Sequence, residues 1–244
     1  MRLNSTCLVA VAACAVALGG CRRGVTPNDQ AAQQSPEGQP CPPEIGMIED
    51  GEDNNNQIIV SQGRGGYMYT FVDKEGSTVT PQSGESGGIF EVSPGGANGT
   101  KFAMRIHGSI GNAEIVYAGM GMNLTEPKGQ YDASKYGGIA FWGKKGPGST
   151  RKLRLKIPDV NTDPQGEVCS ECFNDFGVDL FFNDEWEYFV VPFDKMRQLK
   201  GWGAPKKASI DPSTIYGIQF QVNDKGKNYD IWVDELTFVG CGAG

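Results

Sequence analysis

The chain is poor in the residues that most catalytic and metal sites require. Its 244 residues include one histidine, His107, so a zinc site with two or more histidines is excluded. A Ser-His-Asp arrangement could use only that imidazole. Positive charge is also scarce, because 22 lysines and arginines stand against 29 aspartates and glutamates. The net charge of −7 offers no long-range attraction to nucleic acid or anionic lipid, so no nucleic-acid partner is expected.

Long apolar runs are missing except near the start of the chain. The uncharged run from Leu8 to Leu18 follows Arg2 and is well short of the ~20 residues that a membrane-spanning helix needs. A positive start, a short apolar run and the small residues Gly19 and Gly20 are typical of a secretory signal. We assign this signal to residues 1–20.

The four residues Leu18-Gly19-Gly20-Cys21 resemble the lipobox of bacterial lipoproteins. The resemblance implies cleavage before Cys21, acylation of that cysteine and anchoring to a membrane by lipid. Arg22 rather than an aspartate follows the cysteine, which by analogy indicates the outer membrane of a bacterial cell envelope. The alternative is an ordinary signal that is cleaved nearby.

Four cysteines remain once the signal and Cys21 are set aside: Cys41, Cys169, Cys172 and Cys241. Four cysteines allow three disulfide pairings. We favour Cys169 with Cys172, and Cys41 with Cys241, which would close a loop of about 200 residues and stabilise the fold by roughly 4–5 kcal/mol. The alternative is a zinc site made by all four cysteines, but the second C-x-x-C of that pattern is absent and export favours oxidation.

Three parts are expected along the chain: the signal at 1–20, the lipidated cysteine with a flexible tether at 21–40, and one folded domain at 41–244. The tether is rich in Gln, Pro, Ala and Ser and has few large apolar residues. In the domain, glycine-rich turns separate short runs of period-two alternation, which predict strands with one buried face. The predicted strands cover 66–72, 101–107, 113–117, 138–144, 152–157, 178–182, 187–193, 216–222 and 230–239, and the single helical candidate is 193–199.

Four strings, taken in order, resemble the galactose-binding-like domains and most of all the family 11 carbohydrate-binding modules: Met47–Asp53, Gly137–Trp142, Tyr216–Phe220 and Asp230–Leu236. The resemblance implies an all-β fold, a jelly-roll β-sandwich of two antiparallel sheets with the first strand beside the last. It also implies a concave face that holds a glycan chain, and often structural calcium. The expected function is non-catalytic binding of a glucan-like polysaccharide.

The candidate ligand-binding residues come from strands whose apolar side chains face the core. Arg105, Arg154 and Gln219 belong to the opposite, outward-facing set, and such flat donors suit paired sugar hydroxyls. Aromatic side chains nearby could stack on a pyranose ring. The full set is Tyr67, Tyr69, Arg105, His107, Trp142, Arg154, Gln219 and Gln221. The alternative is an ordinary solvated sheet face, with Trp142 in the core.

An acidic cluster near the start of the domain predicts a calcium site, because Ca²⁺ takes 6–8 oxygen ligands. Its candidate ligands are Glu49, Glu52, Asp53 and Asn54, with Asp234 completing the site if the first strand lies beside the last. The alternative is a solvated acidic turn.

Two other classes of function stay open. A structural lipoprotein could use the same sandwich to hold a protein partner, which an exposed flat apolar patch would support. A hydrolase could use an acid pair, or Ser86 in the string Gly84–Gly88, which matches G-x-S-x-G. A nucleophile elbow needs a strand before that motif and a helix after it, and the glycine-serine surroundings predict a turn instead. We therefore expect that the protein is not an enzyme.

Overall fold

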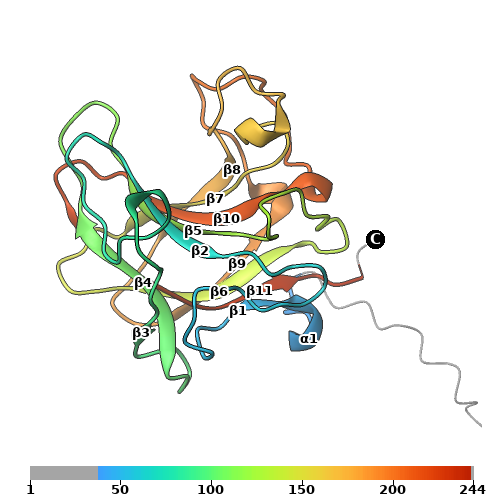
Figure 1. Cartoon of the computed structure of the whole chain (residues 1–244), viewed down its shortest axis with the longest axis horizontal. Helices are drawn as coiled ribbons and strands as arrows, with labels where there is room; N and C mark the ends of the chain where they lie inside the picture. The colour runs from blue at the N-terminus through green and yellow to red at the C-terminus, as the bar shows by residue number, and fades with distance from the viewer. Residues whose placement is uncertain (1–37, 243–244) are drawn as a thin grey trace, which may run out of the picture. The chain divides into compact units, whose positions relative to one another are not determined.

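The protein, analysed as a computed structural model in which residues 38–242 are described, is built from two antiparallel sheets packed face to face. Figure 1 shows them as two layers, the five-stranded sheet above the six-stranded one. The five-stranded sheet has the order β2 (Met68–Val72), β5 (Ala118–Asn123), β10 (Gly217–Val222), β7 (Lys152–Ile157), β8 (Phe176–Phe181). The six-stranded sheet has the order β3 (Ser93–Pro94), β4 (Phe102–Ser109), β11 (Asn228–Val239), β6 (Gly138–Lys145), β9 (Glu187–Pro192), with β1 (Met47–Glu49) also on β11. The expected β-sandwich is confirmed, and the first strand does lie beside the last.

The core lies between the two sheets and follows from the period-two alternation of their strands. In β7, Leu153 and Leu155 are buried and lie on the core side. Phe220 of β10 meets Phe141 of β6 edge to face, with 5.0 Å between ring centroids. Such aromatic pairs between the layers fix how the sheets stack.

Helical structure is slight in the described residues. It comprises α1 (Pro43–Gly46) and four 3₁₀ turns, η1 (Gly84–Ser86), η2 (Pro164–Gly166), η3 (Phe193–Lys195) and η4 (Pro212–Thr214). The predicted helix at 193–199 is thus wrong except for the short turn η3. No helix in residues 38–242 is both long and apolar enough to cross a membrane.

One predicted strand is misplaced. Residues 113–117 form no strand, and the strand of this region is β5, which begins at Ala118. Its sequence alternates methionine with Gly119 and Gly121, and glycine is depleted in strands. The short strands β1 and β3 were also not predicted, because two or three residues are too few to show alternation.

Both expected disulfides are present. Cys41 is joined to Cys241, 200 residues later, and ties the start of the domain to its end. Cys169 is joined to Cys172 in the long loop before β8. The four cysteines therefore form no zinc site. The signal, Cys21 and the tether up to residue 37 lie outside the described residues.

Candidate functional site

The outer face of the five-stranded sheet carries a groove with a volume of about 1180 Å³. Its floor comes from outward side chains of β2, β10 and β7, and its walls come from segments 83–90, 114–117, 172–175 and 199–202. Figure 1 shows the loop before β8, in yellow and orange, rising beside the strands at the top of the sandwich. A large pocket lined by apolar and convergent polar groups is the default position for a ligand.

Two glycines of β5 shape the floor of this groove. A Cβ atom at Gly121 would lie 2.9 Å from the ring of Tyr69, and one at Gly119 would lie 2.4 Å from the ring of Phe71. The two rings of β2 therefore lie down across β5, where any larger side chain would displace them. Their centroids are 6.3 Å apart, so they form a continuous aromatic strip on the floor.

The hydroxyl of Tyr69 is tied to the neighbouring strand. Gln219 of β10 donates its side-chain N–H to this oxygen at 3.0 Å. Burial raises the pKa of Tyr69 to about 12, so the phenol remains protonated and keeps its own O–H to donate. The pair presents a hydroxyl donor and an amide acceptor side by side.

A buried ion pair lies beside these groups. Lys156 of β7 bonds Asp175 at 2.9 Å, and its ammonium also donates to the side-chain oxygen of Gln221 at 3.1 Å. This hydrogen bond fixes the orientation of the Gln221 amide, because Lys156 engages its oxygen and leaves its N–H groups pointing away from the lysine. The second carboxylate oxygen of Asp175 is buried without a hydrogen-bond partner.

Arg154 lines the groove and also bonds residues beside it. One guanidinium nitrogen bonds Asp179 of β8 at 3.0 Å, and the other donates to the backbone carbonyl of Arg197. Burial alone would raise the pKa of Asp179, but hydrogen bonds from Lys152 and Arg154 hold it below its ordinary value. The carboxylate is therefore ionised, and Arg154 stays fixed.

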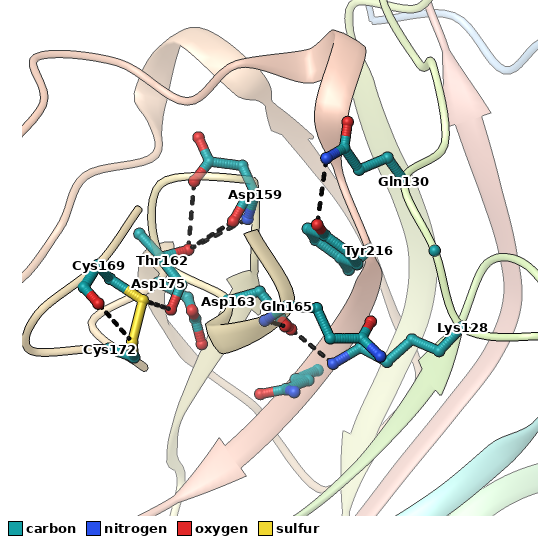
Figure 2. A network of polar contacts seen from close by, with 12 residues as sticks. Lys128, Gln130, Asp159, Thr162, Asp163, Gln165, Cys169, Cys172, Asp175 and Tyr216 are labelled. Atoms are coloured by element: carbon teal, nitrogen blue, oxygen red, sulfur yellow. Dashed lines mark hydrogen bonds and ion pairs between the residues drawn. A yellow bond between two sulfur atoms is a disulfide. The ribbon is translucent and has the colours of Figure 1, made fainter. Parts of the chain in front are cut away.

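A polar network fixes the loop at one end of the groove (Figure 2). Asp159 is fully buried and accepts hydrogen bonds from the backbone N–H groups of Asn161 and Asp211, both at 3.0 Å. Asp163 caps η2 by accepting from the N–H of Gln165 at 2.9 Å, and its other oxygen pairs with Lys128 at 2.6 Å. The loop that carries the wall is thus held by buried carboxylates.

The structure divides the predicted ligand-binding residues between two faces. Those that line the groove are Tyr67, Tyr69, Arg154, Gln219 and Gln221. Arg105 and His107 lie on β4 and Trp142 lies on β6, so these three belong to the outer face of the six-stranded sheet. The eight residues therefore cannot form one site. Alternation identifies the core-facing side chains of β4, β7 and β10 correctly, but it does not say to which sheet a strand belongs.

On the outer face of the six-stranded sheet the side chains cover one another. Arg105 makes two bonds of 2.8 Å to Asp230 and lies 4.4 Å from the ring of Trp232. Lys144 lies 4.7 Å from the ring of Trp186 and 4.9 Å from that of Trp232. These cations occupy the aromatic surfaces that a sugar would need.

The acidic loop after β1 contains a buried carboxylate with one free oxygen. Glu49 is 0% exposed, and one of its oxygens accepts the N–H of Gly51 at 2.7 Å while the other has no partner. Burial, with help from the nearby charges of Asp53 and Asp50, raises the pKa of Glu49 to about 8.

Other predicted metal ligands are already engaged by protein donors. Glu52 accepts from the backbone N–H groups of Lys101 and Phe102 at 2.6 and 2.9 Å. Asp234 accepts from the N–H of Ala97 at 2.7 Å and from the hydroxyl of Thr100 at 2.8 Å, and burial raises its pKa to about 6. Within residues 38–242 no group of three or more His, Cys, Asp or Glu side chains is arranged to hold a metal ion.

The segment that matches G-x-S-x-G forms the 3₁₀ turn η1. A bend precedes it and no α-helix follows it, so the strand–turn–helix arrangement of a nucleophile elbow is not formed there.

The sandwich is similar in fold to solved carbohydrate-binding modules. The family 11 module of the cellulosomal cellulase Lic26A-Cel5E of Clostridium thermocellum matches with a TM-score of 0.56 at 18% identity, covering 80% of this chain and 94% of the module. A family 11 module from Clostridium thermocellum, solved in complex with a β-1,3-1,4-mixed-linked tetrasaccharide, matches with a TM-score of 0.55 at 18% identity, covering 81% and 97%. A family 30 carbohydrate-binding module matches with a TM-score of 0.51 at 9% identity, covering 80% and 98%.

The chain has the fold of these modules. At such low identity the likeness concerns the fold alone. A scan against protein-family models and a search of curated proteins gave no match.

Several groove residues were not among the predicted ones. Phe71 alternates with Tyr67 and Tyr69, and Lys156 with Arg154, so the signal for both was present in the strands. Asp175, Phe173 and Trp202 lie outside the strands, where no periodicity marks a side chain as facing the groove.

Proposed function

We propose that the groove over the five-stranded sheet binds a polysaccharide chain and that the protein catalyses no reaction on it. The observation that carries the proposal is the floor itself, an aromatic strip of Tyr69 and Phe71 beside the polar groups of Gln219 and Gln221. Apolar sugar faces pack on aromatic rings, while sugar hydroxyls pair with amides and phenols. The carbohydrate-binding modules that share the fold support the same function.

The charge of the lining favours an uncharged glycan, such as a glucan. Four basic and four acidic side chains line the groove: Lys128, Arg154, Lys156 and Lys225, against Glu85, Glu114, Asp163 and Asp175. Three of the basic ones are neutralised by ion pairs with carboxylates. A uronate chain would find no free excess of positive charge, whereas a neutral chain needs none.

Affinity electrophoresis of the full chain tests the proposal against soluble neutral polysaccharides, including a β-1,3-1,4-mixed-linked glucan, with polygalacturonate as the charged comparison. We expect retardation by at least one neutral glucan that persists in 0.5 M salt, and none by polygalacturonate. Unretarded migration on every neutral polysaccharide would remove the proposed function.

We also propose that Ca²⁺ binds at the loop after β1. The partnerless oxygen of Glu49 is the supporting observation, since a buried carboxylate oxygen favours a cation or a donor. Asp50 and Asp53 lie close enough for their charges to raise the pKa of Glu49, so the loop has an excess of negative charge that a cation would offset. The ion would stabilise the edge where β1 joins β11 and would supply no chemistry to the groove.

Membrane anchoring stays a proposal as well. We propose that Cys21 is acylated and that the tether holds the domain at the bacterial outer membrane. Cys21→Ser should stop incorporation of labelled fatty acid while sugar retention by the domain stays the same. Unchanged labelling of the variant would exclude lipidation at this residue.

A further inference from the structure

The apolar rim on the β8 side of the groove has no role in the floor described above. Phe173 and Trp202 line the groove there, together with Leu199. Phe173 is 62% exposed, Trp202 44% and Leu199 37%. These exposed fractions are high for large apolar side chains that lie together. The rim stands opposite the aromatic floor of β2, on the far side of β10 and β7.

We infer that the rim beside the Cys169–Cys172 disulfide forms a second stacking subsite, in which Phe173 and Trp202 pack against a sugar ring of the chain that lies on the floor. This rests on the proposed function, because it extends the same groove. It makes the rim a determinant of affinity separate from Tyr69 and Gln219.

The rim is built from two segments, 171–174 and 199–204, that are joined by hydrogen bonds. Asn174 is 2% exposed, and its amide donates to the carbonyls of Leu199 and Trp202, the former at 2.9 Å, while its oxygen accepts from the N–H of Leu199 at 2.8 Å. Glu171 adds a bridge to Ala204. A buried amide with this many backbone bonds positions the two segments and holds the backbone of Trp202 beside the groove.

The conformation of Phe173 also points to a function. Its φ is 72°, in the left-handed region where a bulky side chain is rarely found. Such strain persists only where the surroundings impose it, and it gathers at ligand clamps. Two constraints act here: the disulfide ends at the preceding residue, Cys172, and the N–H of Phe173 donates to the carbonyl of Thr162 at 2.9 Å.

A sugar ring fits this rim better than a protein partner does. The exposed apolar surface continues into a groove in which three of the four basic side chains are paired with carboxylates, which favours a neutral occupant that also reaches the floor. A pyranose offers an apolar face to the rim and hydroxyls to Gln221 and Lys156 at once.

The test compares four variants of the full chain by affinity electrophoresis and calorimetry on β-1,3-1,4-mixed-linked glucan and the other neutral glucans. Phe173→Ala and Trp202→Ala should each weaken binding about tenfold, the loss of one stacking contact. The matched controls, Phe181→Ala and Val168→Ala, should change nothing, because these residues are 56% and 48% exposed but do not line the groove. Melting curves show that each variant is folded.

The role of the disulfide is tested by Cys169→Ala/Cys172→Ala, which leaves Cys41–Cys241 intact. This variant should lose the same factor as Phe173→Ala, and adding Phe173→Ala to it should cost nothing more, since both changes remove one contact. Binding as in the wild type by the cysteine variant would overturn the dependence on the disulfide.

The outcomes separate the two proposals. If the wild type binds a glucan and both rim variants bind equally well, the subsite is overturned while the proposed function stands. If the wild type binds no neutral glucan, the proposed function falls and the subsite falls with it.

Discussion

On the five-stranded sheet the outward side chains of Tyr69, Gln219 and Gln221 line an open groove, whereas on the six-stranded sheet those of Arg105, Lys144 and Trp232 cover one another. Both faces carry aromatic rings, cations and amides or carboxylates. The difference lies in what surrounds them. Loops rise on both sides of the first face, and small glycines lower its floor.

Residue types do not by themselves make a binding face. Trp232 has a guanidinium and an ammonium against its ring, so its surface is satisfied within the protein. Tyr69 has one hydrogen bond from Gln219 and leaves its ring and its O–H toward the groove. A side chain whose partners are incomplete is the better candidate for a ligand contact.

The largest effect is expected from removing the floor. Tyr69→Ala with Gln219→Ala deletes the ring and the amide that meet over β5, and retention on glucan should fall by at least about a hundredfold. Affinity electrophoresis measures the loss, and the melting curve checks the fold.

Trp142→Ala is the matched control on the other face. Its ring lies 5.2 Å from that of Tyr188 on the six-stranded sheet, and its loss should leave retention unchanged. Weakened retention in this variant, with the floor variant unaffected, would move the binding site to the six-stranded sheet.

The second effect concerns calcium at the edge of the six-stranded sheet. The pKa of Glu49 is raised from 4.5 to about 8, so the folded protein holds a proton that the unfolded chain releases. Without calcium the stability that Glu49 contributes is full below pH 4.5 and is lost as the pH rises toward 8. At pH 8, calcium at a hundredfold excess over its Kd should restore about 2.7 kcal/mol of unfolding free energy.

Glu49→Gln is the control for this prediction, because it keeps the shape of the side chain without the charge. The variant should show a flatter dependence of stability on pH and no response of its melting temperature to calcium. Glucan retention should be the same with and without calcium, since the site lies on the other sheet. If calcium does not change the melting temperature of the wild type at pH 8, the loop binds no calcium and is only an acidic turn.

Much of the fold could be predicted from period-two alternation. Leu153 and Leu155 face the core as their spacing indicates, and β7 has the predicted bounds. The pattern failed at β5, where Gly119 and Gly121 occupy the outward positions that polar residues usually mark. Because glycine has no side chain, these two positions show no apolar–polar alternation. The site needs glycine there, because a larger side chain would fill the floor of the groove.

The site could be predicted only in part. Alternation identifies Arg105 and Arg154 equally well as outward-facing, but their sheets are decided by long-range pairing, β4 with β11 and β7 with β8 and β10. The rim residues Phe173 and Trp202 depend on loop geometry, fixed by a disulfide and by Asn174. Such contacts join residues far apart in the chain and leave no periodic signal.

The smallest effect is expected on the outer face of the six-stranded sheet. There a substitution tests whether the cation over the two indole rings stabilises the fold. Lys144→Met keeps the aliphatic stem but removes the charge that lies over Trp186 and Trp232. Cation–π contacts of this kind contribute roughly 0.5–1 kcal/mol, so the melting temperature should fall by about 1–4 °C. Lys74→Met, at an exposed turn, should leave it unchanged. Glucan retention should be the same in both variants, because neither lysine lines the groove. A Lys144→Met protein that melts like the wild type but binds glucan more tightly than the wild type does would show that the cation blocks a sugar surface rather than stabilising the sheet.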